Sequence, residues 1–187
     1  MRIITGSARG VVLNTLVGEN TRPTSERAKE AVFSMLQFEI EGRRVLDLFS
    51  GSGQMGLEAL SRGASFAVMV DKSREAVSVI EKNVVKTKMS EKCRVICGDS
   101  LDYLRKQTDR FDIIWLDPPY DSTLLKSALK LLVEGDFLKQ STILVCESRE
   151  EDVFDGAEEL RDHFLVLRKA KYGIAHITLL KPNPNLL

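Results

Sequence analysis

The hydrophobic residues of the chain gather in short runs that alternate with longer segments of helical spacing. Runs of four or five largely apolar residues are typical of strands buried on both faces of a sheet. Such runs occupy residues 45–49, 66–70, 94–97, 113–116 and 142–146. The segments between them predict helices at 54–62, 73–88, 100–107 and 122–133. This alternation predicts βαβ crossovers, and therefore a parallel sheet covered by helices.

The N-terminal part departs from this alternation. Residues 2–5 and 11–13 flank a turn bounded by two glycines and predict a small β-hairpin. Beyond it, Thr24 can cap a helix in which apolar residues recur at helical spacing as far as Leu36. We expect this helix to lie against the main domain.

The C-terminal part predicts a different kind of pairing. Residues 163–169 and 174–180 lie on either side of Tyr172-Gly173 and predict an antiparallel pair that closes one edge of the sheet. The expected fold is thus α/β, with a mostly parallel seven-stranded sheet, one antiparallel edge strand and the N-terminal hairpin and helix. The expected organisation is a hairpin over residues 1–22, one α/β domain over 23–181 and a loose tail over 182–187.

The composition narrows the class of protein. With 187 residues, 43% of them hydrophobic, the chain is long enough for one globular domain with a buried core. No apolar run approaches the roughly 20 residues of a membrane span, and the N-terminus lacks the apolar segment of a signal peptide, so we expect a cytoplasmic protein. Three cysteines without a CxxC pair, together with two histidines, predict neither a disulfide framework nor a zinc site.

The charges balance overall but are unevenly spread. The chain has 27 basic and 27 acidic side chains. Residues 1–133 carry 20 basic and 17 acidic side chains (+3), residues 134–162 carry 3 and 10 (−7), and residues 163–187 carry 4 and 0 (+4). A polyanionic partner would therefore meet a patterned surface. We expect the acidic run from Glu147 to Glu159 to face away from such a partner.

The residues that follow each predicted strand are the candidates for function, because ligands of open α/β sheets bind beyond the carboxyl ends of the strands. The first strand leads into Gly51-Ser52-Gly53-Gln54-Met55-Gly56, a complete GxGxxG, which lets a ligand approach the backbone at a helix N-terminus. The second ends at Asp71, 20 residues after Gly51, where a carboxylate can accept hydrogen bonds from ribose hydroxyls. A bound nucleoside is predicted, and a glycine turn without a ligand is the alternative.

Asp47, four residues before Gly51, indicates which nucleoside. A pyrophosphate would bring negative charge next to this carboxylate, whereas an ammonium group would be stabilised there. S-adenosylmethionine combines an adenosine with an amino-acid end and so fits both features. The alternative is that Asp47 only holds neighbouring backbone groups. After the third strand, Asp99 could accept a hydrogen bond from the adenine amino group or could cap the next helix.

The most specific motif is Asp117-Pro118-Pro119-Tyr120, after the fourth strand. The prolines stiffen the backbone and remove two N–H donors, so the Asp117 carboxylate and the Pro118 carbonyl stay as fixed acceptors. Such a pair suits the exocyclic amine of a nucleobase, because holding its N–H groups turns the nitrogen lone pair toward an incoming methyl group, and the carboxylate stabilises the charge that develops. Tyr120 offers a stacking face for a base. A rigid turn is the alternative.

The order of these residues carries a family resemblance. Asp47, Gly51-x-Gly53, Asp71, Asp99 and Asp117-Pro118-Pro119-Tyr120 together resemble class I S-adenosylmethionine-dependent methyltransferases acting on exocyclic amines. More narrowly, residues 2–6, 22–24, 33–36 and 57–63 look like the bacterial family that methylates N2 of one guanine in small-subunit ribosomal RNA, the methyltransferase D type. The likeness covers about residues 2–181. It implies a Rossmann-like class I methyltransferase fold and an enzyme that acts on ribosomal RNA. The zero net charge predicts weak, salt-sensitive binding to free RNA, so we expect the substrate to be a partly assembled ribosomal particle and the enzyme to be a monomer.

The resemblance also implies roles for individual residues. Those expected to bind S-adenosylmethionine are Thr24, Asp47, Phe49, Gly51, Gly53, Asp71, Lys72, Asp99 and Ser100. Those expected to act on the guanine amine are Asp117, Pro118, Pro119 and Tyr120, and those expected to face RNA are Arg2, Arg9, Arg22 and Arg27. No metal is implied, and the product is S-adenosylhomocysteine. Two features depart from the family: Gln54-Met55 is bulky, and Asp71 stands where Glu is common.

Other functions stay open at this point. The Asp-Pro-Pro-Tyr motif is shared with DNA amino-methyltransferases, so a DNA or other RNA enzyme acting on N6 of adenine or N4 of cytosine is the alternative within the same class. Against DNA, the chain has no evident extra domain for reading a duplex. A nicotinamide-dependent oxidoreductase using the GxGxxG, and a non-catalytic RNA-binding factor, are the alternatives from other classes.

Overall fold

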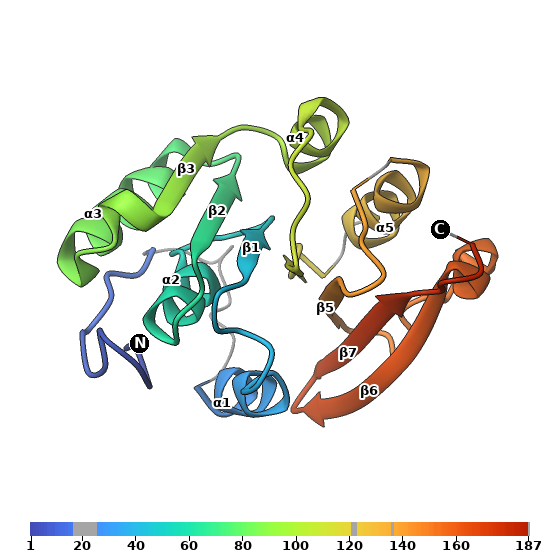
Figure 1. Cartoon of the computed structure of the whole chain (residues 1–187), viewed down its shortest axis with the longest axis horizontal. Helices are drawn as coiled ribbons and strands as arrows, with labels where there is room; N and C mark the ends of the chain where they lie inside the picture. Colours follow the sequence, from blue (N-terminus) through green and yellow to red (C-terminus); the bar gives the residue numbers. More distant parts are fainter. Residues whose placement is uncertain (17–25, 121–122, 136, 187) are drawn as a thin grey trace.

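The five apolar runs and the C-terminal antiparallel pair form one seven-stranded sheet, in which the edge strand Phe164–Tyr172 is largely exposed. This computed structural model describes residues 1–16, 26–120, 123–135 and 137–186, with the side chains of Glu26 and Arg27 left aside. The strands are β1 (Arg44–Asp47), β2 (Phe66–Asp71), β3 (Cys93–Cys97), β4 (Ile113–Leu116), β5 (Ile143–Ser148), β6 (Phe164–Tyr172) and β7 (Ala175–Pro182). Their order is β3-β2-β1-β4-β5-β7-β6, shown in Figure 1.

The strand directions confirm the predicted sheet. Strands β1 to β5 run parallel to one another, and β7 runs antiparallel to both of its neighbours, β5 and β6. The antiparallel pair therefore closes one edge of the sheet, with β7 as the reversed strand and β6 outside it. Strand order reverses between β1 and β4, which is the point at which open α/β sheets bind their ligands.

Within the described ranges, five helices cover the sheet, close to the predicted positions. They are α1 (Glu26–Met35), α2 (Gln54–Ser61), α3 (Arg74–Thr87), α4 (Ser100–Lys106) and α5 (Leu124–Glu134). Two short 3₁₀ segments, η1 (Ser90–Lys92) and η2 (Glu158–His163), were not predicted, because one or two turns leave too few positions for a periodic pattern. The predicted cap of α1, Thr24, lies outside the described residues.

Alternate residues of each strand feed two separate hydrophobic cores. Val45 of β1 belongs to one core and Leu46 to the other, because successive side chains of a strand point to opposite faces. Figure 1 shows α1, α2 and α3 on one side of the sheet and α4 and α5 on the other. Trp115, expected in the core, is 2% exposed and packs on Phe33 of α1 with 5.3 Å between ring centroids.

The N-terminal segment is hairpin-like and packs into the first core. Arg2 and Val12 form a single antiparallel bridge, and the N–H of Ile3 donates to the carbonyl of Val11 at 3.0 Å. The apolar side chains of Ile3 and Leu13 lie in the core shared with α1 and α2. The paired part is thus shorter than the two strands predicted, and the expected boundary at residue 22 stays a prediction.

One buried carboxylate fixes this segment to α2. Glu58 is fully buried, and its two oxygens accept hydrogen bonds from the backbone N–H groups of Ile4 and Thr5 at 2.8 and 3.1 Å. The Arg62 Nε also donates to it at 2.8 Å, and the Lys29 Nζ lies 3.4 Å away. Each charge at this junction is therefore matched by an opposite charge or a hydrogen bond, as burial requires.

The C-terminal segment over residues 182–187, predicted to be a loose tail, is held to the sheet where it begins. Pro182 is the last residue of β7, and the Asn183 N–H donates to the carbonyl of His163 at 2.8 Å. None of the helices found in the described ranges is long and apolar enough to cross a membrane.

Candidate functional site

The glycine loop between β1 and α2 presents its backbone to open space. Gly51 has a φ of +55°, and a Cβ built there would have no atom of the described protein within 4 Å. Gly53, with a φ of +76°, is the N-cap of α2, and a Cβ there would lie 3.1 Å from Ile80 Cγ2. Gly53 is thus required by the fold, whereas the space beside Gly51 can hold a ligand.

Asp71, at the end of β2, holds the glycine loop in place. Its Oδ2 accepts a hydrogen bond from the Gly51 N–H at 2.8 Å, and its Oδ1 accepts one from the Ser73 N–H at 2.8 Å. The residue is half-buried, and each carboxylate oxygen has a second acceptor position. The structure therefore places Asp71 beside the open loop, where a ribose was predicted to bind.

Asp47 lies beneath the same loop, buried at 3% exposure. Its Oδ2 accepts a hydrogen bond from the Gly56 N–H at 3.0 Å. Gly56 comes this close because it has no side chain, since a Cβ there would lie 2.8 Å from Met69 Cγ. Burial, together with repulsion from Asp71, raises the pKa of Asp47 to about 7 despite the hydrogen bonds from Gly56 and Ser50. A cationic group of a ligand would restore its charge.

The loop after β3 supplies two residues with structural partners. The Asp99 Oδ1 accepts hydrogen bonds from the N–H groups of Leu101 and Asp102, at 2.9 and 3.0 Å, and so caps α4. Both bonds use Oδ1, so the cap and an adenine contact through Oδ2 are compatible. The buried Ser100 hydroxyl donates to the carbonyl of Leu48 at 2.6 Å, which ties this loop to the end of β1.

The remaining cofactor candidates are placed less specifically. Phe49 is half-buried and packs against the second core, and Lys72 is exposed at the start of the loop after β2. Thr24 lies outside the described residues. The binding roles of all nine predicted residues stay predictions.

The loop with Asp117, Pro118, Pro119 and Tyr120 follows β4, next to the glycine loop. Because β4 pairs with β1, both loops leave the same edge of the sheet at the point where the strand order reverses. Asp117 is half-buried, Pro118 is buried and Pro119 is exposed. The sequence-predicted glycine loop and base-binding motif are therefore brought together.

Two residues that sequence reasoning missed surround Tyr120. Its hydroxyl donates a hydrogen bond to Oε1 of Glu147, which is 8% exposed near the end of β5. The guanidinium of Arg149 lies over the Tyr120 ring, 5.4 Å from its centroid. A base can therefore stack only on the other face of this ring, or must displace Arg149. The signal available in the sequence was their position directly after a buried strand, the same rule that identified Asp117.

Glu147 also revises the expected orientation of the acidic run that it begins. This carboxylate does not lie on an outer face, because β5 carries it to the carboxyl edge of the sheet and against Tyr120.

One further feature, the buried side-chain amide of Gln54, is consistent with the expected cofactor. Gln54, the first residue of α2 after the glycine loop, is 5% exposed, and its Nε2 is a buried amide donor with no hydrogen-bond partner in the described structure. An unmatched buried donor costs about 1–3 kcal/mol unless a ligand satisfies it. A carboxylate from a ligand's amino-acid end would satisfy Gln54, just as its ammonium group would satisfy Asp47. The bulky Gln54 that departs from the family is thus compatible with this ligand.

The predicted RNA-facing arginines are only partly described. Arg2 and Arg9 are exposed on the N-terminal segment, which Figure 1 shows beside α2 and α3. Arg22 lies outside the described residues. Arg27 belongs to α1, but its side chain is outside the part of the structure described.

Comparison with known proteins identifies the family. A family model described as "Conserved hypothetical protein 95" matches residues 1–181. Ribosomal RNA small subunit methyltransferase D of Haemophilus influenzae is 36% identical over 154 residues, covering 81% of this chain and 80% of that protein. The Escherichia coli K12 protein of the same name is 32% identical over 152 residues, covering 81% and 76%.

Solved structures give the same result over the whole length. The Escherichia coli protein yhhF superposes with a TM-score of 0.85 at 28% identity and covers 98% of both chains. The Haemophilus influenzae protein HI0767 superposes with a TM-score of 0.78 at 31% identity and covers 97% of both. The sequence resemblance and the Rossmann-like methyltransferase fold are confirmed. The chain therefore belongs to the Conserved hypothetical protein 95 family and is a relative of the ribosomal RNA small subunit methyltransferase D proteins.

Proposed function

We propose that this protein methylates the exocyclic N2 amine of a guanine in small-subunit ribosomal RNA, with S-adenosylmethionine as methyl donor. The observation that carries the proposal is the Asp117-Pro118-Pro119-Tyr120 loop beside the open glycine loop, at the point where the strand order reverses. The relatives named ribosomal RNA small subunit methyltransferase D support the choice of substrate. The choice of guanine N2 rests on the family resemblance.

The cofactor end of the site is formed by three side chains. Asp47 would hold the ammonium group of the amino-acid end, Gln54 its carboxylate, and Asp71 the ribose hydroxyls. When bound, S-adenosylmethionine supplies a sulfonium methyl group and leaves as S-adenosylhomocysteine. The ion pair with Asp47 would also remove the cost of keeping that carboxylate ionised while buried.

The base end positions the nucleophile and needs no histidine. The Asp117 carboxylate and the Pro118 carbonyl would accept the two N–H hydrogen bonds of the guanine amine and turn its lone pair toward the methyl group. As the nitrogen–carbon bond forms, positive charge grows on nitrogen, where the carboxylate is most stabilising. Asp117 would also receive the proton that the nitrogen then loses. Glu147 would hold the Tyr120 ring in position for stacking by accepting its hydroxyl hydrogen bond.

The substrate form and oligomeric state complete the proposal. A chain with zero net charge gains little from general phosphate attraction, so we infer that its substrate is a partly assembled ribosomal particle, where shape and protein contacts add affinity. We also infer that it acts as a monomer. Equal activity on protein-free ribosomal RNA and on the particle would contradict the first inference, and a dimer mass in sedimentation would contradict the second.

The test uses small-subunit particles from cells that lack the enzyme. Asp117→Ala is expected to lower the methylation rate by at least roughly 100-fold, the scale of removing one transition-state contact. Affinity for S-adenosylmethionine, measured by calorimetry, should stay close to that of the wild type. Asp155→Ala, at an exposed aspartate, is the matched control and should keep full activity. Mass spectrometry of the nucleosides then identifies the methylated base.

Several outcomes would overturn this function. Methylation that survives Asp117→Ala with little loss would show that this loop is not catalytic. A wild type that binds the RNA but transfers no methyl group would establish a non-catalytic RNA-binding factor. N6-methyladenine or N4-methylcytosine as product, in RNA or DNA, would establish the same-class alternative. Affinity for NAD without affinity for S-adenosylmethionine would establish an oxidoreductase instead.

A further inference from the structure

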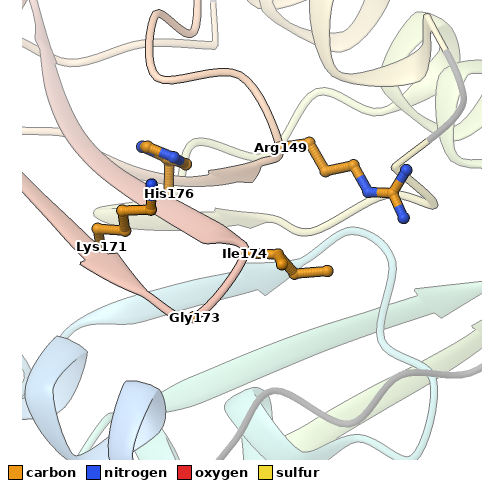
Figure 2. Close-up of a pocket in the computed structure, with 5 residues that line it drawn as sticks. All are labelled: Arg149, Lys171, Gly173, Ile174 and His176. Atoms are coloured by element: carbon orange, nitrogen blue, oxygen red, sulfur yellow. The ribbon is translucent and has the colours of Figure 1, made fainter.

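An open pocket of about 320 Å³ lies at the turn between β6 and β7, next to the end of β5. Its lining consists of Arg149, Lys171, Gly173, Ile174 and His176, which Figure 2 shows around one hollow. The proposed catalytic residues do not line it, and neither do Arg2 and Arg9 of the N-terminal segment.

Strand register brings its polar side chains together. His176 on β7 is paired with Lys171 on β6 and with Ser148 on β5, so the three residues form one row across the sheet. Paired residues of neighbouring strands point to the same face, which places the ammonium and the imidazole side by side. A two-residue turn follows, with Gly173 at a φ of +63° and Ile174 54% exposed. The pocket is thus a rigid feature of the sheet edge.

The chemistry of the lining favours a phosphate with an apolar neighbour. Lys171 and Arg149 are exposed cations, and the segment 163–187 contains four basic and no acidic residues. The acidic residue that β5 brings to this edge, Glu147, is buried and accepts the Tyr120 hydroxyl. Ile174 adds an exposed apolar surface of the kind on which a sugar or base can rest.

The pocket adjoins the base-binding end of the proposed active site through one residue. Arg149 lines the pocket and also lies over the Tyr120 ring, 5.4 Å from its centroid. An RNA strand with its target base at Tyr120 must continue on either side of that nucleotide. The phosphates on one side would therefore pass across Arg149 toward Lys171 and His176.

We propose that this pocket binds the phosphate backbone of the RNA strand next to the target nucleotide. The proposal rests on the proposed function, because it takes Tyr120 as the site of the base. It gives the RNA a contact surface on the β6–β7 edge, in addition to the one predicted on the N-terminal segment. Phosphate contacts of this kind fix the register of the strand without reading its sequence.

The experiment compares RNA binding by the wild type and the double variant Lys171→Ala/His176→Ala. The probe is a transcript of small-subunit ribosomal RNA, titrated at several KCl concentrations in the presence of S-adenosylhomocysteine. We expect the Kd to rise roughly fivefold or more, and the slope of log Kd against log salt to fall by about 0.7–0.9 for the charge removed. In turnover on particles, KM should rise while kcat stays within about twofold of the wild type, because phosphate contacts position the substrate without entering the reaction.

Two further variants keep the result interpretable. Lys181→Ala removes a cation near the far end of the same β6–β7 pair, where Lys181 pairs with Leu165, and should leave the Kd and the salt slope unchanged. Lys171→Glu should weaken binding more than the double variant, because it adds repulsion. All variants should keep the wild-type thermal midpoint and affinity for S-adenosylmethionine.

The outcomes separate this inference from the proposed function. If the double variant has the same Kd for RNA and the same salt slope as the control Lys181→Ala, the pocket is not an RNA contact. This conclusion holds whatever the methylation activity of the double variant. The pocket could also bind inorganic phosphate or guanosine monophosphate while the double variant keeps the RNA affinity of the wild type. That result would likewise overturn the pocket as an RNA contact. A wild type that transfers no methyl to ribosomal RNA would instead overturn the proposed function, while the binding comparison needs no turnover.

Discussion

Two buried carboxylates in this molecule, Glu58 and Asp47, have opposite surroundings. Glu58, on α2, is fully buried and accepts three hydrogen bonds, one of them from a guanidinium, with the Lys29 ammonium 3.4 Å away. Asp47, at the end of β1, is 3% exposed, and none of the groups that shift its pKa is a cation. Both are acids in the interior, yet among the described residues only Glu58 has cations that compensate its charge.

The difference separates a structural acid from a ligand-binding one. Burying a carboxylate is costly unless cations and hydrogen bonds repay the lost hydration, which is the situation of Glu58. At Asp47 the cost appears as a pKa raised to about 7, and it is relieved only when a cation arrives. Incomplete compensation beside an open glycine loop therefore identifies a binding site more specifically than burial or the glycine motif alone.

The largest expected effect is on stability, and it comes from removing the charge of Glu58, the carboxylate that the protein compensates. Glu58→Gln should lower the free energy of unfolding by about 3–5 kcal/mol, because it leaves the Lys29 ammonium buried without its counter-charge. The amide would also turn N–H groups toward donors of the N-terminal segment. Urea denaturation at pH 7 measures the change. Glu81→Gln, at an exposed position on α3, is the matched control and should change stability by less than about 0.5 kcal/mol. A Glu58 variant as stable as this control would show that the junction contributes nothing.

Asp47→Asn should differ from Glu58→Gln in both respects: it should weaken binding of S-adenosylmethionine and retain the stability of the fold. A charge-assisted hydrogen bond contributes about 1.5–3 kcal/mol, so affinity for S-adenosylmethionine should fall by roughly 10- to 100-fold. Between the unfolded pKa of 3.8 and the folded pKa of about 7, the folded wild type holds a proton that the unfolded chain has lost. Wild-type stability therefore falls as pH rises through this window and levels off above it.

The pH dependence provides the internal control for that variant. Calorimetry should show wild-type affinity for S-adenosylmethionine rising from pH 5 to about pH 7, because the ammonium group binds ionised Asp47, and the asparagine variant should lose this rise. Without ligand at pH 8, the variant should be at least as stable as the wild type. A variant that binds normally but unfolds easily would assign Asp47 the structural role of Glu58.

Much of the fold was predictable from the sequence because its strands are buried on both faces. Val45, Leu46 and their equivalents in the other central strands are apolar regardless of the face they meet, so each strand is a continuous run. The N-terminal pairing was overestimated, because among the described residues of this segment only Arg2 and Val12 form a strand bridge, and Ile4 and Thr5 donate to the Glu58 side chain and not to a partner strand. A side chain 54 residues away leaves no local pattern.

The site was predictable where its chemistry follows a strand end in a fixed motif. Asp71 and Asp117 were identified in this way, and the structure places their loops at one edge. Glu147 and Arg149 follow the same rule, but they stand at the start of an acidic run that suggests a solvated surface. Their association with Tyr120 depends on β5 lying next to β4. The sequence predicts that these strands belong to one sheet, but it does not predict which side chains meet at their ends.

The smallest expected effect comes from a substitution that changes no charge. It tests the contact between the N-terminal segment and α2, where Glu58 is buried. Gly6, next to the residues that donate to Glu58, has a φ of +87°, and a Cβ there would lie 1.7 Å from the backbone oxygen of Ser61. Gly10 has a similar φ of +83°, but a Cβ there meets nothing within 4 Å. Both Ala variants therefore carry the same left-handed strain, and only Gly6→Ala adds a clash with backbone. We expect Gly6→Ala to be less stable than Gly10→Ala by about 1–3 kcal/mol in urea denaturation, with affinity for S-adenosylmethionine unchanged in both. Equal stabilities would mean that the segment tolerates displacement from α2, and Glu58 would then lose its role as the anchor that distinguishes it from Asp47.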